Sequence, residues 1–240
     1  MKKFLLFIIS IVMIIPVAAN ASTYQINDDM SININEESWY VFTRDNIKDN
    51  EELDELGITY DYMNDIFNKN NIYLDAVYFY SNDEWIELFV RATENNSIKN
   101  FTNYSNDDIL DFSKQIAKKT DSTNYSVYEN DYKFAYSNYY DKTMDYYIDE
   151  YFTVVNGHNY GITVQKEKEI SFGERQGIRD IVDTIKFNIN PDLKEPEDDE
   201  LTDEEFIGFI VGLVISGIFY LIRIIVAVVI IIKDSKKRKI

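Results

Sequence analysis

The sequence predicts an α+β domain in which helices pack on an antiparallel sheet. Segments 72–80 and 84–92 read as strands, and the few polar residues between them have the spacing of a hairpin. The pair Asn156-Gly157 stands between two further strand runs, which is the strongest short-range hairpin signal. Other segments repeat apolar residues every three or four positions, as amphipathic helices do. Because hairpins join antiparallel strands, we expect the helices to cover an antiparallel sheet.

The first elements of this domain are short. Segment 24–34 predicts a hairpin that turns at Asn27-Asp28-Asp29, and segment 38–43 continues as a strand. Segment 50–56 predicts a short helix closed by Gly57, a residue suited to the left-handed cap position. A second helix follows, and one of its faces carries Tyr60, Met63, Ile66 and Phe67.

The middle of the chain predicts one helix and then several strands. Ser105 with Asp108 forms a capping box that opens a helix through Lys118. We expect the core face of this helix to hold Ile109, Leu110, Phe112 and Ile116. The tyrosine-rich segment 125–151 reads as antiparallel strands, because tyrosine has good strand propensity.

The last element is predicted to be a helix. Ser171 and Glu174 form a second capping box, and the helix is expected to end near Asn188. The apolar residues follow at i, i+3, i+4 and i+7, as Ile178, Ile181, Val182 and Ile185. This helix is expected to pack one face on the sheet.

The amino end has the layout of a secretory signal peptide, segment 1–21. Lys2 and Lys3 precede an apolar run over 4–15, and Ala19-Asn20-Ala21 supplies the small residues that a signal peptidase accepts. The apolar run is short for a bilayer, which needs about 20 residues. We therefore expect cleavage after Ala21 and export of the domain 22–190.

The carboxyl end predicts a membrane anchor. Segment 206–232 is apolar except for Arg223, which is long enough to span a bilayer. An acidic linker, 191–205, precedes this segment, and a basic tail, 233–240, follows it. Positive charge stays in the cytoplasm, so the tail is expected inside and the domain outside the plasma membrane.

Two features of the anchor suggest protein partners. Gly208, Gly212 and Ser216 recur every four residues and leave one helix face almost bare, which suits close pairing of two helices. Arg223 is costly in hydrocarbon and by default indicates a partner carboxylate. Snorkelling of this arginine and the general frequency of glycine in membrane helices stay open as alternatives.

Composition removes several classes of function. The net charge of −18 has the wrong sign for a nucleic-acid backbone, and the absence of cysteine excludes disulfides and thiolate sites. A single histidine, His158, does not provide a histidine-rich zinc site. No catalytic, cofactor or metal-binding residue is therefore assigned. Carboxylates are plentiful, but Glu84 and Glu87 lie three apart in a strand and face opposite sides.

Tyrosines give one candidate ligand surface. Tyrosine offers a large contact area with a polar tip, which suits a glycan or a peptide. Filling of ordinary sheet positions is the alternative and the favoured reading. The candidate aromatic surface comprises Tyr136, Tyr139, Tyr146 and Tyr147.

The last third of the domain resembles a known family. Segment 151–160, around Asn156-Gly157, and the closing run 181–187 resemble the PsbP- and Mog1-like proteins, including surface proteins of low-GC Gram-positive bacteria. The opening run Met30-Ser31-Ile32 before Trp39 is also similar to the first strands of that group. The resemblance implies an α/β/α sandwich that serves as a binding scaffold, with no fixed catalytic residues.

These observations predict a single-pass cell-surface protein with a non-enzymatic extracellular binding domain. Two other functions stay open. One is an accessory subunit of a membrane transporter or enzyme complex. The other is an extracellular hydrolase that uses a pair of carboxylates.

Overall fold

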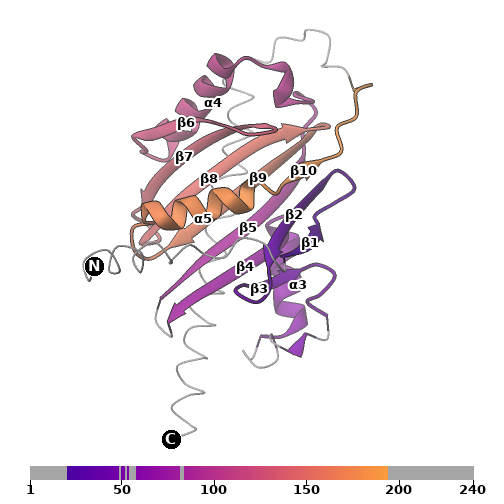
Figure 1. Ribbon diagram of the computed structural model, residues 1–240, viewed down its shortest axis with the longest axis vertical. Helices are drawn as coiled ribbons and strands as arrows, with labels where there is room; N and C mark the ends of the chain where they lie inside the picture. The colour runs from indigo at the N-terminus through magenta and orange to yellow at the C-terminus, as the bar shows by residue number, and fades with distance from the viewer. Residues whose placement is uncertain (1–20, 49, 52, 54–57, 82–83, 194–240) are drawn as a thin grey trace, which may run out of the picture.

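The computed structural model describes residues 21–48, 50, 51, 53, 58–81 and 84–193. Within these residues, ten strands form two antiparallel sheets, and three α-helices and one short 3-10 helix pack around them (Figure 1). The domain is therefore α+β with antiparallel sheets, as the sequence predicts.

The larger sheet has seven strands in the order β3-β4-β5-β9-β8-β7-β6, each antiparallel to its neighbours. Short connections join most sequential strands, so most strands lie beside their neighbours in the sequence. The pairing of β5 with β9 is the exception in this sheet. The strands are β3 (Tyr40–Thr43), β4 (Ile72–Ser81), β5 (Glu84–Glu94), β6 (Asn124–Glu129), β7 (Lys133–Asp141), β8 (Tyr146–Val155) and β9 (His158–Lys166).

The hairpin predicted at Asn156-Gly157 is confirmed. The two residues have φ angles of 52° and 71° and connect Val155 directly to its partner His158. Two successive left-handed residues match the twist of the flanking strands. A Cβ atom at Gly157 would lie 3.1 Å from the carbonyl oxygen of Asn95, so close contact as well as the positive φ favours glycine here.

The smaller sheet has three strands, β1 (Ala21–Gln25), β2 (Met30–Asn35) and β10 (Lys186–Phe187), in the order β1-β2-β10. The first two form the hairpin predicted over 24–34. Alternate residues of β2, namely Met30, Ile32 and Ile34, are buried, and they join the main core. The small sheet therefore packs on the larger one through one face of β2.

One face of the large sheet, the α5 face, is covered by the small sheet and by α5 (Phe172–Val182) (Figure 1). Its core is apolar: Leu88 and Ile162 of the central strands are 0% exposed and belong to one cluster with Ile178 of α5. The capping box at Ser171 and Glu174 is present, as predicted.

The opposite face, the α3/α4 face, carries two separate helices. Helix α3 (Tyr60–Lys69) packs on the β3-β4-β5 side through Met63, Ile66 and Phe67. Helix α4 (Asn106–Lys119) and the 3-10 helix η1 (Phe101–Asn103) pack on the other side, against β7 and β8. The predicted capping box of α4 is present.

Between these two helices the central strands carry what we call the polar band. Arg91 Nη2 lies 3.1 Å from Glu150 Oε1, and both side chains lie next to Gly161 of β9, where an added Cβ would be 3.7 Å from Arg91 Nη2. Burial raises the pKa of Asp75 to about 7, and it raises the pKa of the neighbouring Glu87 well above its ordinary value. The members are all buried: Asp75, Glu87, Arg91, Glu150, Thr163 and Gln165.

Two predictions are corrected by the structure. The last helix ends at Val182 rather than near Asn188, and Lys186-Phe187 instead pairs with β2. Ile185 would be buried in a longer helix and is also buried beyond the observed end of the helix, so its i+7 spacing did not distinguish the two. Leu110, expected in the core, is 38% exposed on α4, because its neighbours Ile109 and Phe112 already face the sheet.

Several predictions lie wholly or partly outside the described residues. They are the body of the signal peptide, most of the linker, the anchor 206–232, the tail 233–240 and much of the helix 50–56. Among the helices within the described ranges, none combines the length and the apolar character that crossing a bilayer requires.

Candidate functional site

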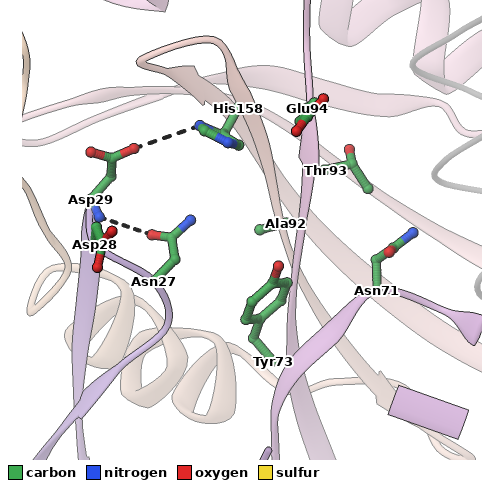
Figure 2. Close-up of a pocket in the computed structure, with 9 residues that line it drawn as sticks. All are labelled: Asn27, Asp28, Asp29, Asn71, Tyr73, Ala92, Thr93, Glu94 and His158. Atoms are coloured by element: carbon green, nitrogen blue, oxygen red, sulfur yellow. Dashed lines mark hydrogen bonds and ion pairs between the residues drawn. The ribbon is translucent and has the colours of Figure 1, made fainter. Parts of the chain in front are cut away.

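A pocket of about 540 Å³ opens on the α5 face, where the β1–β2 turn faces the ends of β5 and β9 (Figure 2). We call it the acidic pocket. It is larger than the other pocket described below, and it combines carboxylates, amides, a hydroxyl, an aromatic ring and an imidazole. It is lined by Asn27, Asp28, Asp29, Asn71, Tyr73, Ala92, Thr93, Glu94 and His158.

The β1–β2 turn forms one wall, and the side chain of Asn27 shapes it. Asn27 Oδ1 accepts hydrogen bonds from the backbone N–H groups of Asp29 at 3.1 Å and Met30 at 3.0 Å. Its amide nitrogen donates to the hydroxyl oxygen of Tyr160 at 2.9 Å. This is the local turn chemistry expected of Asn, and it ties the turn to β9.

The opposite wall comes from strand ends that pair across the sheet. Glu94, the last residue of β5, is the register partner of His158, the first residue of β9. Tyr73, near the start of β4, rises between this wall and the turn, as Figure 2 shows. The guanidinium of Arg44 lies 4.0 Å from the centre of the Tyr73 ring, which holds the ring in place from outside the lining.

The charge of the acidic pocket is one-sided. Asp28, Asp29 and Glu94 bring three carboxylates, and the lining includes no lysine or arginine. Asp28 and Glu94 are exposed, while Asp29 is partly buried. His158 Nδ1 lies 3.5 Å from Asp29 Oδ2, so a protonated imidazole would balance one of the three charges.

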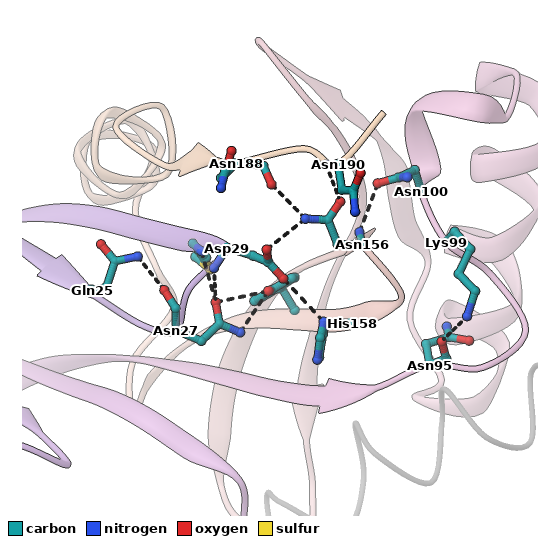
Figure 3. Close-up of polar contacts among 12 residues, drawn as sticks. Gln25, Asn27, Asp29, Asn95, Lys99, Asn100, Asn156, His158, Asn188 and Asn190 are labelled. Atoms are coloured by element: carbon teal, nitrogen blue, oxygen red, sulfur yellow. Dashed lines mark hydrogen bonds and ion pairs between the residues drawn. The ribbon is translucent and has the colours of Figure 1, made fainter. Parts of the chain in front are cut away.

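A cluster of amide side chains behind the pocket fixes the position of Asp29. The amide nitrogen of Asn156 donates to Asp29 Oδ1 at 2.9 Å and to the carbonyl oxygen of Asn188 at 2.7 Å (Figure 3). The backbone N–H of Asn156 donates to Asn100 Oδ1 at 3.0 Å, and Asn190 N–H donates to Asn156 Oδ1 at 2.8 Å. One turn residue therefore connects the pocket to both the η1 loop and the end of the domain.

The four tyrosines of the predicted aromatic surface do not share one exposed face. Tyr136 and Tyr147 point to the α5 face, and Tyr139 and Tyr146 belong to a cluster on the α3/α4 face. Their side chains are buried except for Tyr147, which is partly buried. Adjacent tyrosines in a strand necessarily alternate between faces, which separates the set.

The predicted helix-packing residues Gly208, Gly212 and Ser216, and the intramembrane charge Arg223, lie outside the described residues. Glu84 and Glu87 do face opposite sides: Glu84 lies 3.0 Å from Lys166 Nζ at the α5 face, and Glu87 lies in the polar band. In the described part of the chain, no group of three or more metal-ligating side chains has the geometry of a metal site.

Of the two walls of the acidic pocket, the sequence predicts the β1–β2 turn but not the wall formed by the ends of β5 and β9. The run Asn27-Asp28-Asp29 stood out as a turn. No sequence pattern connects His158, Glu94 and Tyr73 with this turn, because they reach the pocket only through the register of the sheet.

Comparison with models of known protein families gives no match for this chain, and comparison with curated proteins likewise finds no relative. Any function must therefore be argued from the site itself.

Proposed function

We propose that this chain is a single-pass cell-surface protein whose outer domain is a non-enzymatic binding module, and that the acidic pocket receives a cationic group of the ligand. The observation that carries the proposal is the charge of the pocket. Its lining supplies three carboxylates and no lysine or arginine. Such a site attracts an ammonium group and repels phosphates and carboxylates.

The neutral groups of the pocket also suit an organic cation. Tyr73, Asn27, Asn71 and Thr93 add hydrogen-bonding groups beside the carboxylates. An ammonium group donates hydrogen bonds in three directions, which carboxylate and amide oxygens accept. A polyamine or a lysine side chain of a surface peptide matches this arrangement better than a bare metal ion does.

The location rests on the sequence. The signal peptide 1–21 and the apolar segment 206–232 with its basic tail both require the domain to face outwards. The layered arrangement of helices on both faces of the sheet supports the finer proposal of a PsbP- and Mog1-like α/β/α sandwich. The accessory-subunit alternative depends on Arg223 and stays a prediction.

The binding experiment uses the full chain in nanodiscs of zwitterionic lipid, with spermidine as the probe in isothermal titration calorimetry. The double substitution Asp28→Asn/Glu94→Gln removes two exposed carboxylates and should weaken binding by about tenfold. The matched control Asp61→Asn/Asp107→Asn removes the same net charge from exposed first turns of α3 and α4.

Equal weakening in both double variants would show that spermidine responds only to overall charge, and the pocket would be rejected as its site. The location is tested separately by adding protease to intact cells. Digestion of the outer domain is expected, whereas full protection would refute the proposed orientation.

A further inference from the structure

A second pocket, of about 240 Å³, lies at the other end of the α5 face. Tyr147, in its lining, pairs with Lys166 at the end of β9, whereas the acidic pocket includes His158 at the start of β9. The two sites are therefore separated by most of that strand, roughly 25 Å. We call this site the tyrosine pocket. It is lined by Asp121, Ser122, Thr123, Asn124, Asn138, Tyr139, Tyr140, Tyr147, Asp149, Glu169 and Arg175.

Two tyrosine rings form one wall of this pocket. Tyr140 of β7 and Tyr147 of β8 are direct cross-strand partners, with ring centres 4.9 Å apart and planes inclined by 45°. The hydroxyl of Tyr140 is hydrogen-bonded to Asp145, which fixes the ring from outside the pocket. Tyr140 is nevertheless 40% exposed, so an aromatic surface remains open to a ligand.

A continuous hydrogen-bond network forms the polar side. Arg175 Nε donates to Asp149 Oδ2 at 2.9 Å, and Tyr136 donates its hydroxyl proton to the same oxygen at 2.9 Å. Asn138 donates to the Tyr136 hydroxyl oxygen at 3.0 Å, and Asn124 donates to Asn138 Oδ1 at 3.1 Å. Asp149 is only 2% exposed, so this network is anchored in the interior and its groups are held in place.

The lining of the tyrosine pocket has three carboxylates, Asp121, Asp149 and Glu169, and one cation, Arg175, whereas the lining of the acidic pocket has no lysine or arginine. Arg175 neutralises Asp149 by a two-point contact, and Lys142 lies 3.3 Å from Asp121. Asp121 and Glu169 are exposed, so solvent and salt screen their charges. Because Arg175 neutralises the buried Asp149, the inner part of the pocket has no uncompensated charge, which favours a neutral ligand.

The side chains of the lining also favour a saccharide over a peptide as the neutral ligand. Apart from the tyrosine rings, every lining side chain is polar, and none is aliphatic. A peptide usually anchors through an apolar side chain in an apolar pocket, which this site does not offer. A sugar ring has an apolar C–H face that packs on a tyrosine ring, and hydroxyl groups that exchange hydrogen bonds with amides, hydroxyls and a guanidinium.

We propose that the tyrosine pocket binds a neutral saccharide, with one sugar ring against Tyr140 and Tyr147 and its hydroxyl groups toward Asn124, Asn138 and Arg175. This site is independent of the acidic pocket in place and in chemistry. A domain with both sites contacts a hydroxyl-rich polymer and a cationic group on the same face.

The test uses the full chain in zwitterionic nanodiscs and two soluble neutral probes, an oligomer of N-acetylglucosamine and an oligomer of glucose. Saturation-transfer NMR should show transfer to the ring protons of at least one probe. Tyr140→Ala should weaken that binding by about tenfold, because it removes the exposed part of the aromatic wall.

Tyr125→Ala is the matched control. Tyr125 lies on the neighbouring strand β6, is 38% exposed and does not line the pocket. It should leave saccharide binding unchanged, and Tyr140→Ala should leave spermidine binding unchanged.

Absence of transfer to both probes would overturn the proposal, and so would equal binding by wild type and Tyr140→Ala. Circular dichroism of Tyr140→Ala verifies the fold. Should this variant unfold, Asn124→Ala, an exposed substitution at the same pocket, takes its place with the same expected result.

Discussion

The two faces of the seven-stranded sheet both bury side chains, but the chemistry of the buried side chains differs. The α5 face holds a continuous apolar cluster, with Leu88, Val90 and Ile162 at its centre. The α3/α4 face has separate apolar clusters, two beneath its helices and one around Trp85, Tyr146 and Ile148, and it also carries the polar band. Burial is favourable for the first set and costly for the second unless partners or protons compensate.

The two faces should therefore respond differently to substitution and to pH. On the α5 face, stability depends on how completely the buried apolar side chains fill the core. In the polar band it depends on which groups are charged, because one carboxyl oxygen each of Asp75, Glu87 and Glu150 has no hydrogen-bond partner among the described residues.

The largest expected effect is at Arg91. Arg91→Met leaves Glu150 buried without its cation, and we expect a loss of about 3–5 kcal/mol in the free energy of unfolding. Thermal unfolding followed by fluorescence of the buried Trp39 and Trp85 measures it. The double variant Arg91→Met/Glu150→Leu should recover most of the loss, since an apolar pair then replaces the ion pair. If Arg91→Met were as stable as wild type, the idea that charge pairing governs the stability of the polar band would be wrong.

A smaller loss is expected on the α5 face. Ile162 is 0% exposed, and Ile162→Ala should cost about 3 kcal/mol through lost contacts and the cavity left behind. The control is Ile189→Ala, at a residue that is 37% exposed, which should change stability by less than about 0.5 kcal/mol. Urea denaturation compares both with wild type. Equal losses in the two variants would contradict the assignment of Ile162 to the core.

The smallest effect concerns pH. Burial raises the pKa of Asp75 from 3.8 to about 7, so the native state holds a proton that the unfolded chain releases. Stability from this group is fully present below about pH 4 and is lost as the pH rises toward 7. Between pH 5 and pH 8 we expect a loss of about 2 kcal/mol, which Asp75→Asn should reduce.

Urea denaturation at a series of pH values measures this dependence. Asp61→Asn, an exposed change in the first turn of α3, should leave the pH slope as in wild type. A wild-type stability that rises from pH 5 to pH 8 would show that Asp75 is ionised in the native state.

Alternation and turn chemistry were sufficient to predict most strands. The hairpins at Asn27-Asp28-Asp29 and Asn156-Gly157 are local features, since the residues in the turn determine the geometry of the turn. The two capping boxes at Ser105 and Ser171 are local for the same reason, because the cap is satisfied within the first turn of the helix.

The polar band could not be predicted in this way. Asp75 and Arg91 occupy strand positions that alternate with apolar residues, a pattern usually read as a solvent-facing side. Alternation assigns a residue to one side of a sheet, but it does not say whether that side meets water. The packing of α3 and α4 on this face comes from contacts distant in sequence.

The two pockets could not be predicted from local sequence either. The acidic pocket joins the first hairpin to Glu94 and His158, and the tyrosine pocket joins β7 and β8 to Arg175 of α5. A one-residue change of register would send these side chains to the other face. The tyrosine-rich composition therefore indicated strands, but it did not indicate which tyrosine rings line a pocket.

The amide cluster around Asn156 has a mechanical consequence. The Asn156 side chain forms hydrogen bonds with the backbone of Asn188 and Asn190 and also with Asp29 at the edge of the acidic pocket. Tension applied along the chain from its carboxyl end would act on these hydrogen bonds before it reached the long strands. Such tension would therefore act on the edge of the acidic pocket, at Asp29, before it acted on the core of the domain.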